Sequence, residues 1–95
     1  MKGELLEGRD LSRISKSTAR VFHVIHAHWP INPVEVAHVL GDKGKVKSLS
    51  AKYIYHFKKL ADEELIRLKM IGNTYIAWPT DVEKLRVIHE LMRGL

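Results

Sequence analysis

The sequence predicts a single, mainly α-helical domain that contains one small β-hairpin. Its 95 residues suit one small domain. Apolar residues recur at helical spacing in four segments, which are residues 15–29, 33–40, 48–63 and 80–95. Between the third and fourth segments, residues 65–70 alternate between apolar and polar, and the turn-forming pair Gly72-Asn73 follows.

The composition favours a protein that binds polyanions. Sixteen Lys and Arg against eleven Asp and Glu give a net charge of +5, which promotes binding to phosphates through counterion release. No cysteine is present, so disulfides and thiolate metal sites are excluded. Residues 1–4 do not open a signal peptide and no apolar run approaches the ~20 residues of a membrane span, so we expect a cytoplasmic protein. The absence of glutamine is typical of thermophiles and favours an archaeal source.

The first two helices have recognisable ends. Ser15 or Ser17 can cap the first, whose apolar face is Val21, Phe22, Ile25 and Trp29. Trp29 precedes Pro30, which ends that helix. A capping box opens the second helix, with Asn32 as N-cap, Pro33 next and Glu35 at the third position. We expect Val36, Ala37 and Leu40 to face inward, and Gly41 to end the helix.

The third helix is predicted to begin near Ser48 or Ser50 and to end at about Glu63. Its expected buried stripe is Ile54, Phe57, Leu60 and Ala61. The opposite face is expected to carry Lys52, Tyr55, His56 and Lys59, whose spacing places them on one side of a helix.

The alternating segment predicts a half-buried hairpin. Ile66, Leu68 and Met70 fall on one side of the first strand, and Arg67 and Lys69 on the other. Gly72-Asn73 permits the positive backbone dihedrals of a tight turn. Residues 75–78 form the return strand, which Pro79 closes.

The last segment predicts a helix with an apolar seam. Thr80 to Glu83 read as a capping box. The seam then consists of Leu85, Ile88, Met92 and Leu95, with Leu91 beside it. We expect this helix to form a homodimer; the alternative is that it packs back across the three-helix core.

The segment from His56 to Ile66 resembles the junction of recognition helix and wing in winged helix-turn-helix proteins. Those proteins commonly carry a glycine before the Leu-Ile pair, where this chain has Glu64. The resemblance covers residues 17–79, and with the C-terminal helix the layout is similar to a minimal PadR-type protein. It implies three parts, namely an N-terminal arm (1–14), a winged helix-turn-helix domain (15–79) and a C-terminal dimerisation helix (80–95).

This resemblance implies that the third helix enters the major groove of DNA. The residues expected to contact DNA from this helix are Lys47, Ser48, Ser50, Lys52, Tyr53, Tyr55, His56 and Lys59. Those expected from the wing are Arg67, Lys69 and Asn73. The alternatives are a solvated helix face and an ordinary surface hairpin. A second basic set can touch the DNA backbone or merely keep the arm soluble; it comprises Arg9, Arg13, Lys16 and Arg20.

The layout and length are also similar to those of small archaeal plasmid-segregation proteins. That resemblance implies a homodimer that binds a palindromic, centromere-like site on double-stranded DNA, spreads along it and recruits a ParB-like adaptor protein. A small transcriptional repressor is the closest alternative. A winged helix that grips a protein partner instead of DNA is a further alternative.

Enzymatic and metal functions are not indicated. No nucleophile with a neighbouring base and no phosphate-cradling loop is recognisable, so we expect neither catalysis nor a cofactor. His23, His26 and His28 lie close in sequence, but no acidic residue or cysteine in that run completes a metal site.

Overall fold

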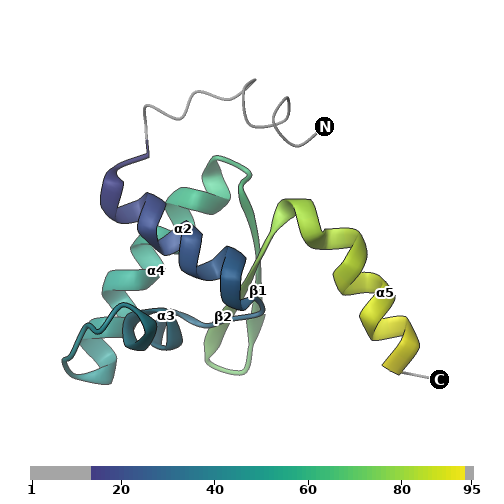
Figure 1. Cartoon of the computed structure of the whole chain (residues 1–95). Coiled ribbons are helices and arrows are strands. Elements are labelled where there is room, and N and C mark those ends of the chain that lie inside the picture. Colours follow the sequence, from purple (N-terminus) through teal and green to yellow (C-terminus); the bar gives the residue numbers. More distant parts are fainter. Residues whose placement is uncertain (1–13, 94–95) are drawn as a thin grey trace.

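The computed structural model describes residues 14–93, except the side chains of residues 83–86 and 89. Its helices are α2 (Lys16–His28), α3 (Pro33–Val39), α4 (Val46–Asp62) and α5 (Glu83–Arg93), and a 3-10 turn, η2 (Thr80–Val82), precedes α5. The strands are β1 (Ile66–Ile71) and β2 (Thr74–Pro79), which pair antiparallel (Figure 1). The predicted helical domain with one hairpin is confirmed. The predicted N-terminal arm lies outside the described residues, apart from Ile14.

Side-chain caps begin α2 and α3 where the sequence predicts them. The Ser15 hydroxyl accepts the N–H of Thr18 at 3.1 Å. The Asn32 side chain accepts the N–H of Glu35 at 2.8 Å, and the Glu35 carboxylate accepts the N–H of Asn32 at 2.9 Å. This reciprocal pair is the capping box that the spacing indicates.

Helix α4 begins earlier than predicted. Its N-cap is Lys45, which makes no side-chain capping bond, so neither Ser48 nor Ser50 caps it. The first turn is attached to the core by Leu49, which is 5% exposed. The Leu49 N–H donates to the Lys45 carbonyl. The predicted buried stripe is also partly wrong, because Ile54 and Ala61 are only half-buried. The buried face is Leu49, Tyr53, Phe57 and Leu60.

The core lies between the three helices α2, α3 and α4 and one face of the hairpin (Figure 1). Its largest fully buried side chains include Phe57, Ile25 and Leu60. Phe22 is only partly buried and packs against this cluster from α2. Removing a phenyl group from such a site typically costs about 3–5 kcal/mol. The core therefore fixes the orientation of α4.

The hairpin turns at Gly72-Asn73, as predicted. Gly72 has a φ of 61°, and the flanking Ile71 and Thr74 are paired. Strand β1 begins at Ile66, and Met70 is more than half exposed instead of buried, since it lies near the tip of the hairpin. A feature that the sequence pattern did not predict is a one-residue bridge on the other edge of β2, where Ile31 and Ala77 exchange two backbone hydrogen bonds.

The junction before α5 differs from the predicted capping box. Residues 80–82 form the 3-10 turn, so α5 begins at Glu83. The Thr80 hydroxyl donates to the carbonyl of Glu64 at 2.9 Å, and the Thr80 N–H donates to the carbonyl of Leu65 at 3.0 Å. Thr80 thus ties the root of α5 to the end of α4, and α5 then extends away from the helical core (Figure 1).

Helices α3 and α4 end in the same backbone motif, but with different residues at its left-handed position. After α3 this residue is Gly41, with a φ of 76°, and the N–H groups of Gly41 and Asp42 donate back to His38 and Ala37. After α4 it is Glu64, with a φ of 61°, and Glu64 and Leu65 donate back to Ala61 and Leu60. This is the Schellman motif, which favours glycine. Glu64, which has a side chain, therefore holds a strained backbone conformation.

We predict that Glu64→Gly is more stable than Glu64→Ala. Both variants remove the side chain, but only glycine relieves the left-handed backbone, and the difference should be about 1 kcal/mol in the free energy of unfolding. Urea denaturation followed by circular dichroism measures it. Equal midpoints for the two variants would show that the backbone at this position is not strained.

Candidate nucleic-acid interface

A polar stripe runs along the exposed side of α4. It consists of Ser48, Lys52, Tyr55 and Lys59, all of them exposed. Tyr55 is 59% exposed, and the Lys59 ammonium lies 6.0 Å from the centre of its ring. The only acidic residue of α4 is Asp62, in the last turn. The stripe therefore offers an aromatic ring, hydroxyls and two cations, and its own helix carries no carboxylate before Asp62.

Lysines extend this positive surface beyond the stripe. Lys43 and Lys45 are exposed in the loop before α4, and Lys47 is exposed in its first turn. Lys58 points elsewhere, because its ammonium lies 5.8 Å from the ring of Tyr75 on the hairpin. The start of α4 and its stripe thus form one continuous basic region.

One lysine of the stripe is held by a carboxylate from the preceding loop. Lys52 donates to Asp42 at 2.7 Å, and the Tyr53 hydroxyl donates to the same Asp42 oxygen at 2.8 Å. The bond from Lys52, and then that from Tyr53, holds the pKa of Asp42 below its ordinary value. The ion pair is largely exposed, so its contribution to stability is small. Its effect is to fix the direction of Lys52.

Three predicted contact residues are less accessible than their positions on the helix suggest. Tyr53 is 5% exposed and belongs to the core. Ser50 is half-buried. His56 is half-buried as well, although it lies one turn from the exposed Lys52. Helical spacing assigned these residues to a side of α4 but did not show where α2 and the loop cover it.

His56 is part of a hydrogen-bonded chain that joins α4 to α2. The Ser15 hydroxyl donates to the Thr18 hydroxyl at 3.1 Å, and the Thr18 hydroxyl lies 2.9 Å from Nδ1 of His56. Thr18 is 2% exposed, so its hydroxyl needs a partner. The Thr18 hydroxyl thus has one partner on its own helix and one on α4.

The basic residues of the hairpin lie on a different side. Arg67 pairs with Trp78 and Lys69 with Ile76, on the sheet face opposite Ile66 and its core neighbours. Both cations are exposed, but the hairpin separates them from the α4 stripe. Asn73 is exposed at the tip. The structure therefore does not bring Arg67 and Lys69 together with the predicted contact residues of α4.

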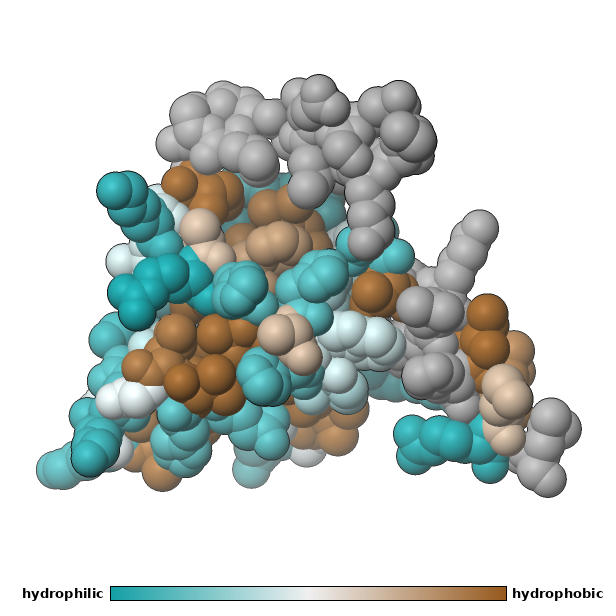
Figure 2. All heavy atoms as spheres, viewed as in Figure 1, coloured by the Kyte–Doolittle hydropathy of each residue, from teal (hydrophilic) through white to brown (hydrophobic). Residues whose placement is uncertain are grey.

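Helix α5 presents an apolar face to solvent. Val87, Ile88, Leu91 and Met92 are 41%, 47%, 68% and 65% exposed. Apolar side chains gather on the outer side of this helix in Figure 2. The alternative in which the seam packs back across the three-helix core is therefore wrong for these residues. The side chain of Leu85 and the whole of Leu95, which complete the predicted seam, lie outside the described parts.

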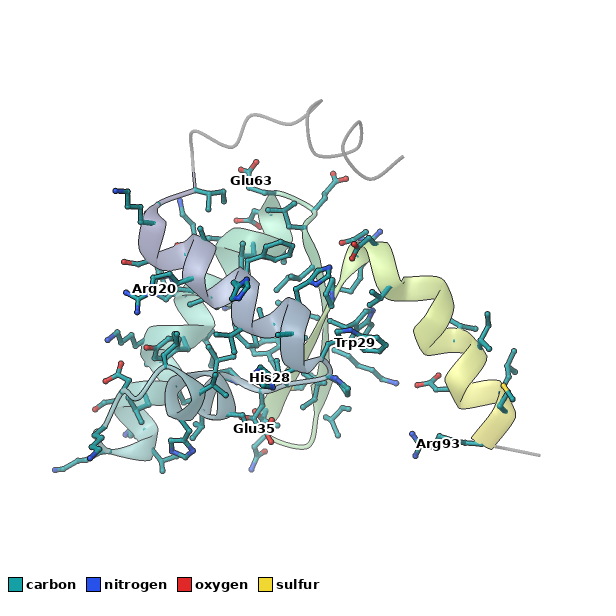
Figure 3. All side chains as sticks on the ribbon, viewed as in Figure 1. Arg20, His28, Trp29, Glu35, Glu63 and Arg93 are labelled. Carbon is teal, nitrogen blue, oxygen red and sulfur yellow. The ribbon has the colours of Figure 1, made fainter. Side chains whose placement is uncertain are left out.

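The inner side of α5 is charged. Glu90 and Arg93 line a cavity of about 180 Å³ that also borders Trp29 and Trp78. Figure 3 shows Arg93 pointing back from α5, and Trp29 at the end of α2 on the side of α5. The apolar and charged faces of α5 are thus separated, with the apolar face turned outward.

The histidines of α2 do not assemble into a metal site. His26 Nε2 lies 3.3 Å from Asp81 Oδ2, which links the end of α2 to η2, while His23 and His28 are exposed. Among the side chains that the structure describes, no three or more His, Cys, Asp or Glu residues cluster as a metal site requires. The helices described here are all too short or too polar to cross a membrane.

We predict that stability falls when the pH drops below about 6.5. Burial lowers the pKa of His56 from its ordinary value of 6.5, and the charge of Lys52 adds to this effect. The unfolded chain therefore binds the proton more readily, so stability is complete above that pH and is lost as the pH falls through the lowered pKa. Thermal unfolding between pH 7 and 5 measures the loss. The His56→Gln variant should lose less over this range; an identical pH profile would contradict the role of His56.

Comparisons with models of known families, with curated proteins and with solved structures find no match for this chain. The stripe of α4 is the surface with the most exposed hydrogen-bonding and charged groups suited to a ligand. The exposed apolar face of α5 is a second candidate binding surface.

Proposed function

We propose that the protein is a winged helix-turn-helix that binds double-stranded DNA, with α4 as the recognition helix and the hairpin as the wing. The observation that carries this proposal is the exposed stripe of α4 and the lysines at its start, with no acidic residue on α4 itself before Asp62. The succession of α2, α3, α4 and hairpin supports it, as does the bridge between Ile31 and Ala77. A helix of this kind fits the width of the major groove.

Within this proposal the residues of α4 have different roles. Lys52 and Tyr55 project from the middle of the stripe and are the candidates for base edges. Lys47, Ser48 and Lys59 are candidates for backbone phosphates on either side. Lys52 has to exchange Asp42 for DNA, because the pair is closed in the free protein.

The wing has a smaller role in this proposal. Asn73 at the tip is the candidate for contact with the DNA backbone. Arg67 and Lys69 lie on the outer face of the hairpin, so we assign them no base contact. They raise the local positive potential, which favours DNA at any sequence.

We further propose that α5 makes the protein a homodimer. Four exposed apolar side chains on one side of a short helix form a self-complementary surface in a two-fold dimer. Such a dimer would present two copies of α4 to an inverted repeat, with major grooves about 34 Å apart.

The role of the bound dimer is also a proposal, and it rests on the resemblance to plasmid-segregation proteins. We propose that the dimer binds a palindromic partition site and spreads along the flanking DNA, where a ParB-like adaptor can join it. Repression of transcription is the second candidate. A footprint over increasing protein concentration separates them, since protection that extends beyond the site indicates spreading and protection that stays bounded indicates a repressor.

A protein partner for α4 is the alternative outside DNA binding. A helix face that binds a protein partner would be apolar, whereas the stripe carries Lys52 and Lys59. Binding to arbitrary duplex DNA at low salt decides between the two. No binding under those conditions would exclude the DNA proposal.

We predict that Lys52→Ala combined with Tyr55→Ala abolishes the preference for a specific site. Lys59→Ala, in contrast, should weaken binding to all sequences alike and reduce the slope of log affinity against log salt by about 0.9. Fluorescence anisotropy with specific and arbitrary duplexes measures both. Unchanged site preference in the double variant would refute the assignment of these two side chains to base edges.

We predict that Ile88→Asp converts the dimer to monomers and lowers the affinity for the inverted repeat. A carboxylate cannot be buried in an apolar interface without a partner. Light scattering measures the mass in solution. Val34→Asp, on the half-buried side of α3, is a control for placing the same charge elsewhere. A dimer that persists in the Ile88 variant would rule out α5 as the interface.

A further inference from the structure

A polar hollow lies between α2, the loop before α4, and α4 itself. Its volume is about 330 Å³, and it opens to solvent. The polar side chains that line it are Ser17, Arg20, Asp42, Lys52, Tyr53 and His56. Lys52 belongs both to this hollow and to the exposed stripe of α4, so the two surfaces adjoin.

The hollow has an excess of positive charge. Arg20 reaches it from α2 and Lys52 from α4, whereas Asp42 is the one carboxylate among the described residues that line it. Asp42 is already engaged by Lys52 and Tyr53 through one oxygen. Arg20 is exposed and makes no ion pair with any side chain that the structure describes. One cation of the hollow is thus available for an incoming anion.

The charge of Arg20 acts inside the hollow. Burial raises the pKa of the Tyr53 hydroxyl, whereas the nearby charge of Arg20 opposes this rise. Arg20 leaves α2 on the side away from α5 (Figure 3). A guanidinium in this position can donate two N–H groups to the oxygens of one phosphate, and the Ser17 hydroxyl can donate a third.

We propose that this hollow binds a phosphate of the DNA backbone, held by Arg20 and Ser17. This inference rests on the proposed function, since the phosphate belongs to the duplex whose groove α4 would occupy. The hollow borders the stripe on the side of α2, where the flanking DNA strand passes if α4 lies in the major groove. Arg20 is thereby distinguished from Lys16, the other described residue of the basic set, which does not line the hollow.

The test compares two variants that remove the same charge from the same helix. Arg20→Gln should lower the affinity for duplex DNA at least about tenfold, since it removes charge-assisted hydrogen bonds. It should also reduce the slope of log affinity against log salt by about 0.9. Lys16→Gln, one turn away, should change affinity less than about threefold. Arg20→Lys keeps the charge without the planar fork and should fall between the wild type and Arg20→Gln.

The outcomes separate the inference from the proposed function. Wild-type protein that binds no duplex at low salt overturns both. If the wild type binds and Arg20→Gln binds equally well, or if Lys16→Gln loses as much as Arg20→Gln, only the inference fails. Arg20 is exposed, so circular dichroism is expected to show an unchanged fold in its variants.

A second measurement identifies the source of the phosphate. The Arg20 side-chain N–H resonance should shift on addition of duplex DNA, and much less with inorganic phosphate at matched ionic strength. Saturation by inorganic phosphate, together with unchanged DNA affinity in Arg20→Gln, would define a site for small anions and overturn the proposal.

Discussion

The burial of one face of α4 is the constraint on which the rest of the structure depends. Phe57 and Leu60 are fully buried, and they fix the rotation of the helix about its own axis. A fixed rotation sets the direction in which the Cα–Cβ bond of every other residue leaves the helix. The burial of Phe57 therefore determines that Lys52 and Tyr55 face solvent. A core substitution that rotates α4 would move the basic stripe as a unit.

The two edges of the stripe differ in the contacts that their side chains make. On the edge near α2, Lys52 is bonded to Asp42 and His56 is linked to Thr18. On the opposite edge, the Lys59 ammonium lies 6.0 Å from the centre of the Tyr55 ring, and that ring packs edge-on against the His56 ring, with centroids 5.4 Å apart. Lys52 would therefore have to leave Asp42 before it could bind DNA, whereas Lys59 would break no hydrogen bond that the structure describes.

How far the sequence predicted this molecule depends on whether a signal is local. The caps at Ser15 and Asn32 and the turn at Gly72 were predictable, because each is decided within a few residues. The half-burial of His56 was not, because it depends on Thr18, which is 38 positions away in the chain. The bridge from Ile31 to Ala77 was not predictable either, because it joins residues that are far apart in the sequence. For the candidate site, spacing found the exposed stripe, but Arg20 became distinguishable from Lys16 only when α2 was packed against α4.

The attachment of α5 links the proposed dimer to the proposed DNA contact. The two hydrogen bonds described for Thr80 end on Glu64 and Leu65, in the turn between α4 and β1. The root of α5 is therefore tied to the turn that follows α4. In a dimer that assembles through the outer face of α5, this short connection would set the distance between the two copies of α4. Half-site spacing would then depend on the backbone around Glu64, the one non-glycine residue with a positive φ among residues 14–93.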